Sequence, residues 1–124
     1  MALSHVGIVS VPVSDPDRAK AFYVEVLGFE VLADTQITDD MRWVQVGLPG
    51  AQTSLTLVTW FPSMPAGSSK GLVIETDDLE ADITLITEAG VPVSPIEEQP
   101  WGRFVTLADP DGNGIIVQDS VGGP

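Results

Sequence analysis

Few residues in this chain could do acid–base, nucleophilic or metal chemistry. There is one histidine, His5, and no cysteine, so thiol catalysis is excluded, and no nucleophile-elbow pattern accompanies the histidine. Glu75 is a carboxylate in an apolar segment (LVIET) and shares strand phase with Gly71 and Val73. If Glu75 is buried in a cup, it becomes a candidate general base. The alternative is a strand-end carboxylate that lies in solvent or pairs with an arginine.

Aromatic residues are the second group with a possible function. They are rare overall but fall near predicted strand ends and loops, at Trp43, Trp60, Phe61, Trp101 and Phe104. Arg42 and Arg103 lie close to two of the tryptophans in the sequence. Such a set indicates a pocket for a planar or anionic small molecule. The alternative is that these side chains build the core or a dimer interface, where aromatic residues are also enriched.

Composition limits the classes of partner. The chain has 124 residues, of which 44% are hydrophobic, and a formal net charge of −13. That length suits one domain with a real core, and the acidic surface disfavours nucleic acid and anionic membranes. No basic leader or long apolar run is present. We therefore expect one cytoplasmic domain over residues 1–124, with no nucleic-acid or membrane partner.

The elements that carry these residues follow one order twice. Asp15 with Pro16 and Asp78 are predicted to cap two helices, which end at Gly28 and Gly90. Alternating Val- and Ile-rich segments predict the strands. In the first half the strands are at 5–13, 29–33, 42–48 and 54–60, and in the second half at 71–76, 91–93, 103–108 and 114–118. The acidic pairs at 39–40 and 97–98 are expected to lie in solvated loops.

This order predicts an internal duplication. The fold class is α+β, with two βαβββ modules at 1–62 and 70–120, a linker at 63–69 and a frayed tail at 121–124. A four-stranded module cannot cover its sheet alone, so the modules must pair with each other or with a second chain.

Three motifs resemble the vicinal-oxygen-chelate superfamily, which includes glyoxalase, bleomycin-resistance and extradiol dioxygenase proteins. They are VSDPDRAKAFY with LGF in the first helical region, VIETDDL at the second module, and ADPDGN in the final turn. The resemblance implies a cup-shaped mixed sheet that encloses a pocket, and a homodimer. The family contains both enzymes and antibiotic-binding proteins, so the fold alone does not select the function.

The resemblance also implies four metal-ligand positions, two in each module. In this sequence they correspond to Ile8, Thr56, Gly71 and Ile116, which lack the imidazole and carboxylate groups that divalent metals prefer. His5 lies three residues before the first position, which turns its side chain to the opposite strand face. We therefore expect no metal and no other cofactor. A divalent metal that uses His5 is the alternative.

The sequence favours a metal-free protein that binds a small hydrophobic or aromatic molecule in its cup. The residues expected to line the pocket are Trp43, Thr56, Trp60, Phe61, Trp101, Arg103, Phe104 and Ile116. One alternative is an enzyme, either a metal-dependent lyase or dioxygenase, or a metal-free isomerase that uses Glu75 as its base. Another is an interaction module whose function is its dimer.

Overall fold

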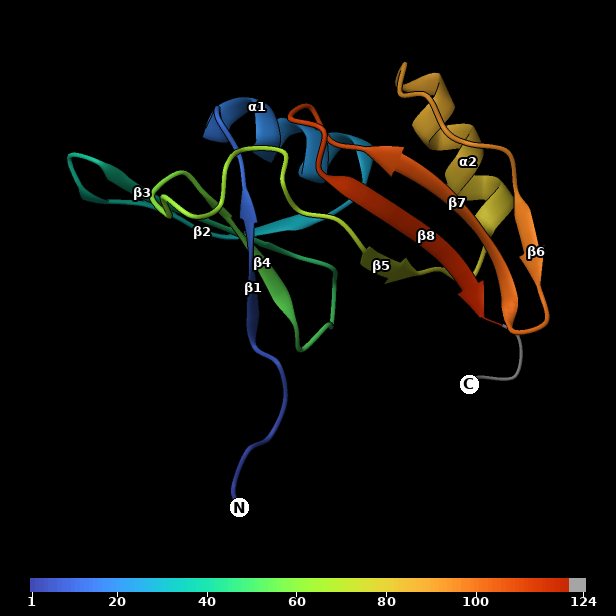
Figure 1. Cartoon of the computed structure of the whole chain (residues 1–124), viewed down its shortest axis with the longest axis horizontal. Helices are drawn as coiled ribbons and strands as arrows, with labels where there is room; N and C mark the ends of the chain where they lie inside the picture. Colours follow the sequence, from blue (N-terminus) through green and yellow to red (C-terminus); the bar gives the residue numbers. More distant parts are fainter. Residues whose placement is uncertain (121–124) are drawn as a thin grey trace.

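The first half of the chain forms a four-stranded mixed sheet with one helical segment. The computed structural model describes residues 1–120; the predicted tail at 121–124 lies outside them. The elements of this half are β1 (Ile8–Pro12), α1 (Pro16–Ala21), η1 (Phe22–Val26), β2 (Glu30–Thr38), β3 (Met41–Gly47) and β4 (Ser54–Val58). The strand order is β1-β4-β3-β2, with β1 parallel to β4 and the other neighbours antiparallel. We call this sheet A (Figure 1).

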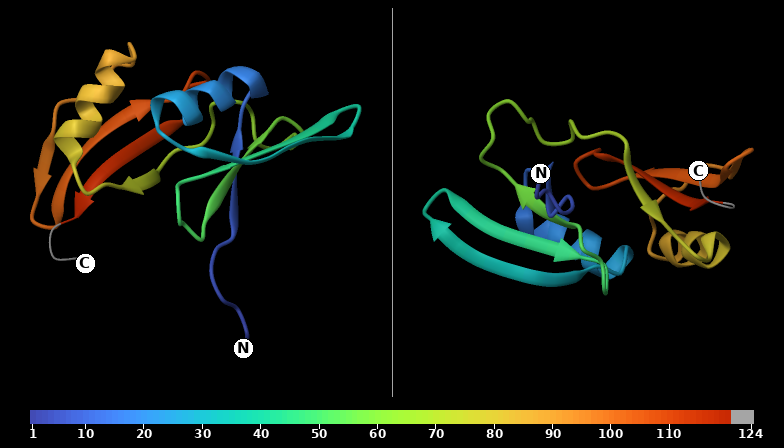
Figure 2. Two further views of the ribbon diagram at one scale, coloured as in Figure 1. Left: turned by 180° about the vertical axis from the view of Figure 1, so that it is seen from behind. Right: turned by 90° about the horizontal axis from the view of Figure 1, so that it is seen from below.

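The second half repeats the arrangement. Its elements are β5 (Leu72–Glu75), α2 (Leu79–Glu88), β6 (Glu97–Gln99), β7 (Gly102–Ala108) and β8 (Gly114–Ser120). The order β5-β8-β7-β6 and the parallel β5–β8 pair match sheet A position for position. This is sheet B. The predicted α+β class with two βαβββ modules is confirmed, and the modules form two separate sheets that lie side by side (Figures 1 and 2).

One predicted strand is wrong. Residues 91–93 have no strand structure, and the first strand after α2 is β6, over Glu97–Gln99. Pro92 and Pro95 have no backbone N–H to give to a ladder. Between the two prolines, the N–H of Ser94 donates to the carbonyl of Thr106 at 3.0 Å, and the N–H of Thr106 donates to the hydroxyl of Ser94 at 2.8 Å. These two hydrogen bonds are isolated and do not extend into a ladder. The acidic pair at 97–98, expected in a loop, therefore lies in an exposed edge strand.

The first helical region also differs from the prediction of one regular helix. It changes at Phe22 from α-helix to a π-helical turn, in which Leu27 N–H donates to the carbonyl of Phe22 five residues earlier, at 3.3 Å. The wider turn places Phe22 and the neighbouring Tyr23 side by side in the core, with their rings 5.3 Å apart and edge to face. π-bulges of this kind are rare and reshape the surface that a helix presents.

The predicted caps hold both helices. The carboxylate of Asp15 accepts from the N–H groups of Asp17 and Arg18 at 3.0 and 3.2 Å, and Asp78 accepts from Ala81 N–H at 3.0 Å. The helices pack on one continuous apolar core that draws residues from both modules. No helix within residues 1–120 is long and apolar enough to cross a membrane.

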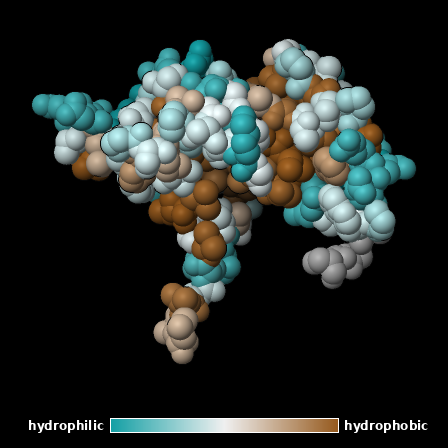
Figure 3. Space-filling model, viewed as in Figure 1, coloured by the Kyte–Doolittle hydropathy of each residue, from teal (hydrophilic) through white to brown (hydrophobic). Residues whose placement is uncertain are grey.

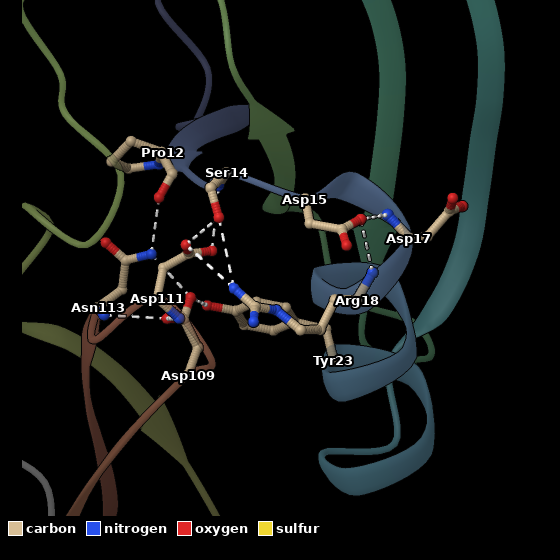
Figure 4. A network of polar contacts seen from close by, with 9 residues as sticks. All are labelled: Pro12, Ser14, Asp15, Asp17, Arg18, Tyr23, Asp109, Asp111 and Asn113. Atoms are coloured by element: carbon tan, nitrogen blue, oxygen red, sulfur yellow. Dashed lines mark hydrogen bonds and ion pairs between the residues drawn. The ribbon is translucent and has the colours of Figure 1, made fainter.

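A polar network around the β7–β8 turn fastens the two modules together (Figure 4). Tyr23 Oη donates to Asp109 Oδ2 at 2.9 Å, and Asn113 Nδ2 donates both to that oxygen, at 2.7 Å, and to the carbonyl of Pro12, at 2.8 Å. The other oxygen of Asp109 accepts the N–H groups of Asp111 and Asn113, each at 2.9 Å. Four donors thus satisfy a buried carboxylate without a cation.

Candidate functional site

Three aromatic side chains of module one, Trp43, Trp60 and Phe61, form one cluster at an end of sheet A. The rings of Trp43 and Trp60 are stacked with centroids 6.2 Å apart, and Phe61 lies 5.9 Å from Trp60. Phe61 is 43% exposed, and both tryptophans are partly exposed. Trp43 Nε1 donates to Gln45 Oε1 at 3.1 Å, which fixes the orientation of its indole. This cluster therefore offers a broad and accessible aromatic surface.

Trp43 belongs to the face of sheet A that turns away from the core, which we call the open face of sheet A. The strand register aligns Ser10, Thr56 and Gln45 across β1, β4 and β3 on that face. Gln45 Nε2 donates to Ser54 Oγ at 2.8 Å. Thr56 is only 1% exposed in the single chain. This face is polar but uncharged along that row.

Module two presents a matching face, the open face of sheet B, which lies opposite the core residues Val105 and Val117. One row of the register crosses all four strands there. It runs from Glu97 on β6 through Phe104 on β7 and Gln118 on β8 to Glu75 on β5. Residues directly opposite each other in a ladder project from the same face. The row therefore ends in a carboxylate on each side, with an aromatic ring and an amide between them.

Trp101 completes this surface. Its ring stacks on Phe104 with centroids 5.5 Å apart and planes inclined by 7°, and it is 43% exposed. Ile116 lies in the next row of the register, between Thr106 and Val73. An exposed indole stacked on a phenyl ring gives a flat platform on which a planar molecule can lie.

Glu75 lies on the open face of sheet B and is exposed. Its carboxylate accepts from Gln118 Nε2 at 3.0 Å and from the hydroxyl of Ser120. The burial that would favour a general base is not found in this chain. Its role as a catalytic base stays a prediction. Its carboxylate lies in the same row of the register as Phe104 but two strands away, with Gln118 between them.

The two arginines near the tryptophans lie away from the open faces. The guanidinium of Arg103 pairs with Glu80 at 2.6 Å and with Asp119 at 3.4 Å, and that of Arg42 pairs with Asp34 at 2.9 Å and with Asp17 at 2.7 Å. Both residues alternate in strand phase with their aromatic neighbours, so they project from the opposite side of the sheet. The hydrogen bond from Arg103 lowers the pKa of Glu80 to about 2.

The positions where the resemblance implied metal ligands carry no ligand set. Thr56 and Ile116 lie on the open faces of different sheets, Ile8 is the first residue of β1, and Gly71 precedes β5. The ring of His5 lies in the exposed segment before β1, where Ser4 Oγ is 2.8 Å from its Nδ1. Residues 1–120 hold no group of three or more His, Asp or Glu side chains that could bind a metal ion. The residues present do not fit the metal centre of the family's enzymes.

Two cavities open at the junction between the modules, where hydrophobic residues gather in the space-filling view (Figure 3). The larger, of about 620 Å³, lies between the end of η1 and α2, and the smaller, of about 260 Å³, lies beside Phe29 and Leu55. Leu48, Ile74 and Glu75 line both. None of the eight predicted pocket residues lines either cavity.

The structure therefore brings the predicted residues together as two separate groups. Trp43, Trp60 and Phe61 meet on sheet A, whereas Trp101 and Phe104 meet on sheet B. Gln118 and Glu97, which lie opposite Phe104, and Ser120, which contacts Glu75, were not predicted from the sequence. The signal that could have found them is the turn at 109–113, which sets the register of β7 against β8 and so places Gln118 opposite Phe104.

Comparison with known proteins places this geometry in a family. The profile of the Glyoxalase/Bleomycin resistance protein/Dioxygenase superfamily matches residues 2–117. The chain belongs to this superfamily, as its motifs indicated.

Its relatives are similar over their whole length. The crystal structure of TnmS3, an antibiotic binding protein from Streptomyces sp. CB03234, is 51% identical, with a TM-score of 0.93 over 98% of this chain and 99% of that one. A superfamily member from Sphaerobacter thermophilus is 34% identical, with a TM-score of 0.88 over 97% and 100%. YetH of Bacillus subtilis (strain 168) is 30% identical over 94% of this chain and 99% of its own.

Proposed function

We propose that this protein binds a small hydrophobic or aromatic molecule, without a metal, on the aromatic surfaces of its open sheet faces. The observation that carries the proposal is the stacked pair of Trp101 and Phe104, a flat ring surface that is exposed rather than used in the core. The blank ligand positions remove the usual reason to assign metal chemistry to this fold. TnmS3, an antibiotic binding protein, is similar to this chain over nearly its whole length, and this similarity supports a binding role.

We further propose that a homodimer completes the site. Within one chain the sheet A cluster and the Trp101–Phe104 platform remain apart, and each open face lacks a second wall. Small-molecule sites bury most of their ligand's surface. A second copy can supply the missing wall, because it carries the complementary aromatic group.

The segment before β1 supports the dimer. Residues 1–7 leave the body of the molecule in an extended course (Figures 1 and 2). Leu3 is 87% exposed and Val6 63% exposed. The edge strands β1 and β5 each have a hydrogen-bonded neighbour on one side only. Exposed apolar side chains next to unpaired strand edges are typical of a surface that another chain covers.

A tryptophan-fluorescence titration tests the binding role. The wild-type protein is titrated with a panel of planar aromatic compounds and antibiotics, and we expect saturable quenching by some of them. Trp101→Ala removes the upper ring of the platform and should weaken binding by about tenfold. Thr84→Ala, at an exposed position on α2 outside both cavities, is the control and should leave affinity unchanged. A panel in which nothing binds contradicts the proposal.

A further inference from the structure

The row of sheet B that contains Phe104 has a carboxylate at each end, Glu97 next to Phe104 and Glu75 two strands away beyond Gln118, and no lysine or arginine in it. Glu75 is held by Gln118 and Ser120, which are both neutral, so its hydrogen bonds orient the carboxylate without compensating its charge. Glu97 lies at the other end of the same row. Three strand spacings separate the two ends, which is roughly 14 Å across the sheet.

The five lysine and arginine side chains all form their contacts outside this row. There are five lysines and arginines, and all lie within the described residues. Arg18 and Lys70 bind the turn between β7 and β8, through Asp111 at 3.5 Å and the carbonyl of Gly112 at 2.7 Å. Lys20 and Arg42 share Asp34, at 2.7 and 2.9 Å. Arg103, the closest in sequence to the platform, binds Glu80 on the opposite side of sheet B.

The same holds for the lysine and arginine side chains of a second copy, which have the same ion pairs and hydrogen bonds. A ligand with a carboxylate or phosphate on the platform would lie beside Glu75 with no nearby cation, which is unfavourable by charge repulsion. A ligand with an ammonium, amidinium or several N–H or O–H donors would instead satisfy the free acceptor capacity of Glu75.

We infer that the molecule bound on the Trp101–Phe104 platform is a planar aromatic that carries a cationic or hydrogen-bond-donating group, and that Glu75 selects it. This inference rests on the proposed binding function and adds the ligand class to it. It also revises the expectation from the sequence, which allowed an anionic ligand because Arg42 and Arg103 are near the tryptophans in the chain. Strand alternation and their ion pairs turn both arginines away.

The test uses three planar tricyclic probes of similar size: proflavine (cationic), xanthone (neutral, without a hydrogen-bond donor) and anthracene-9-carboxylate (anionic). Each is titrated by isothermal calorimetry into the full chain at about 0.15 M salt, which screens the long-range field of the acidic surface. The variants are Glu75→Gln and, as the matched control, Glu98→Gln. Glu98 is exposed and lies opposite Arg103 in the register, so it projects from the other face of sheet B.

We expect proflavine to bind at least about fivefold more tightly than the neutral probe, and the anion more weakly than both. Glu75→Gln should weaken proflavine binding about fivefold and leave the dissociation constant of the neutral probe unchanged. Glu98→Gln should leave both dissociation constants unchanged. Neutral or anionic probes that bind as tightly as proflavine, or equal effects of the two variants, would overturn the inference while the binding function stands. If none of the three binds, the inference fails, whereas the proposed function is decided by the wider panel of the fluorescence titration.

Discussion

Tyr23 shows how much a single buried residue contributes to this molecule. It is the only tyrosine of the chain, it is fully buried, and its hydroxyl joins the helical segment of module one to the Asp109 carboxylate of module two. Burial and the neighbouring Asp109 both raise the pKa of its phenol far above the ordinary value. The residue therefore serves the junction of the modules and not the open faces.

Tyr23→Phe should lower the free energy of unfolding by about 1.5–3 kcal/mol, because the variant keeps the ring but removes a hydrogen bond to a buried charged acceptor. Urea denaturation measures the change. Ser14→Ala removes a hydroxyl that contacts Asp111 from an exposed position, at 2.5 Å, and should cost less than about 1 kcal/mol. If the two variants lose the same free energy of unfolding, the buried hydrogen bond contributes no more to stability than the exposed one.

The raised pKa of Tyr23 predicts that the folded protein has no titrating phenol in the alkaline range where a free tyrosine ionises. A spectrophotometric titration reads this directly, since no second tyrosine contributes. Tyrosinate absorbance should rise only together with the loss of secondary structure by circular dichroism. A smooth titration in the still-folded protein would contradict the buried hydrogen bond.

At the scale of elements, ion pairs tie helices to strands on the side away from the open faces. Arg103 on β7 holds Glu80 on α2 through two short contacts, at 2.6 and 3.0 Å. Because this bond lowers the pKa of Glu80 from 4.5 to about 2, the folded state holds the proton more weakly than the unfolded state. The stabilisation is complete above pH 4.5 and is lost as the pH falls through that value towards about 2.

Glu80→Gln should therefore lower the thermal midpoint at neutral pH and make it fall less steeply between pH 4.5 and about 2. Melting curves followed by circular dichroism across that range measure both effects. Glu88→Gln, at the other end of α2, removes the same charge and should keep the wild-type profile. If the two variants have the same acid profile, the Arg103 contact does not control the titration.

The elements themselves were largely predictable from local signals. Asp15 and Asp78 were identified as caps by residue type and position, and the structure confirms the bonds they form. The π-helical turn at Phe22 left no such signal, because it depends on how Phe22 and Tyr23 pack against the core. The position of β6 was missed because Glu97 and Glu98 look like loop residues and become a strand only through pairing with β7.

For the whole molecule, the central feature is that two similar modules each leave an aromatic open face. The sequence located the aromatic residues but not their grouping, which depends on register and on the separation of sheet A from sheet B. It also placed Arg103 in the pocket because the residue is close to Trp101 in the chain, whereas strand alternation sends its side chain to Glu80.

The proposed dimer gives a prediction at this scale. Replacing the exposed apolar side chains of the first residues, in the double variant Leu3→Ser and Val6→Ser, should weaken dimerisation by at least about tenfold. Sedimentation equilibrium over a concentration series measures the dissociation constant. Ala2→Ser in the same segment is the control and should leave it unchanged. A wild-type chain that stays monomeric throughout the series would contradict the dimer.

Metal-free binding of an aromatic molecule is tested by calorimetric titration of the tightest probe before and after dialysis against EDTA, with metal content measured in both samples. We expect the same dissociation constant and stoichiometry in both samples, without stoichiometric metal in either. Binding that disappears with EDTA and returns with one divalent ion would contradict it and would return the chain to the metal-dependent branch of its superfamily.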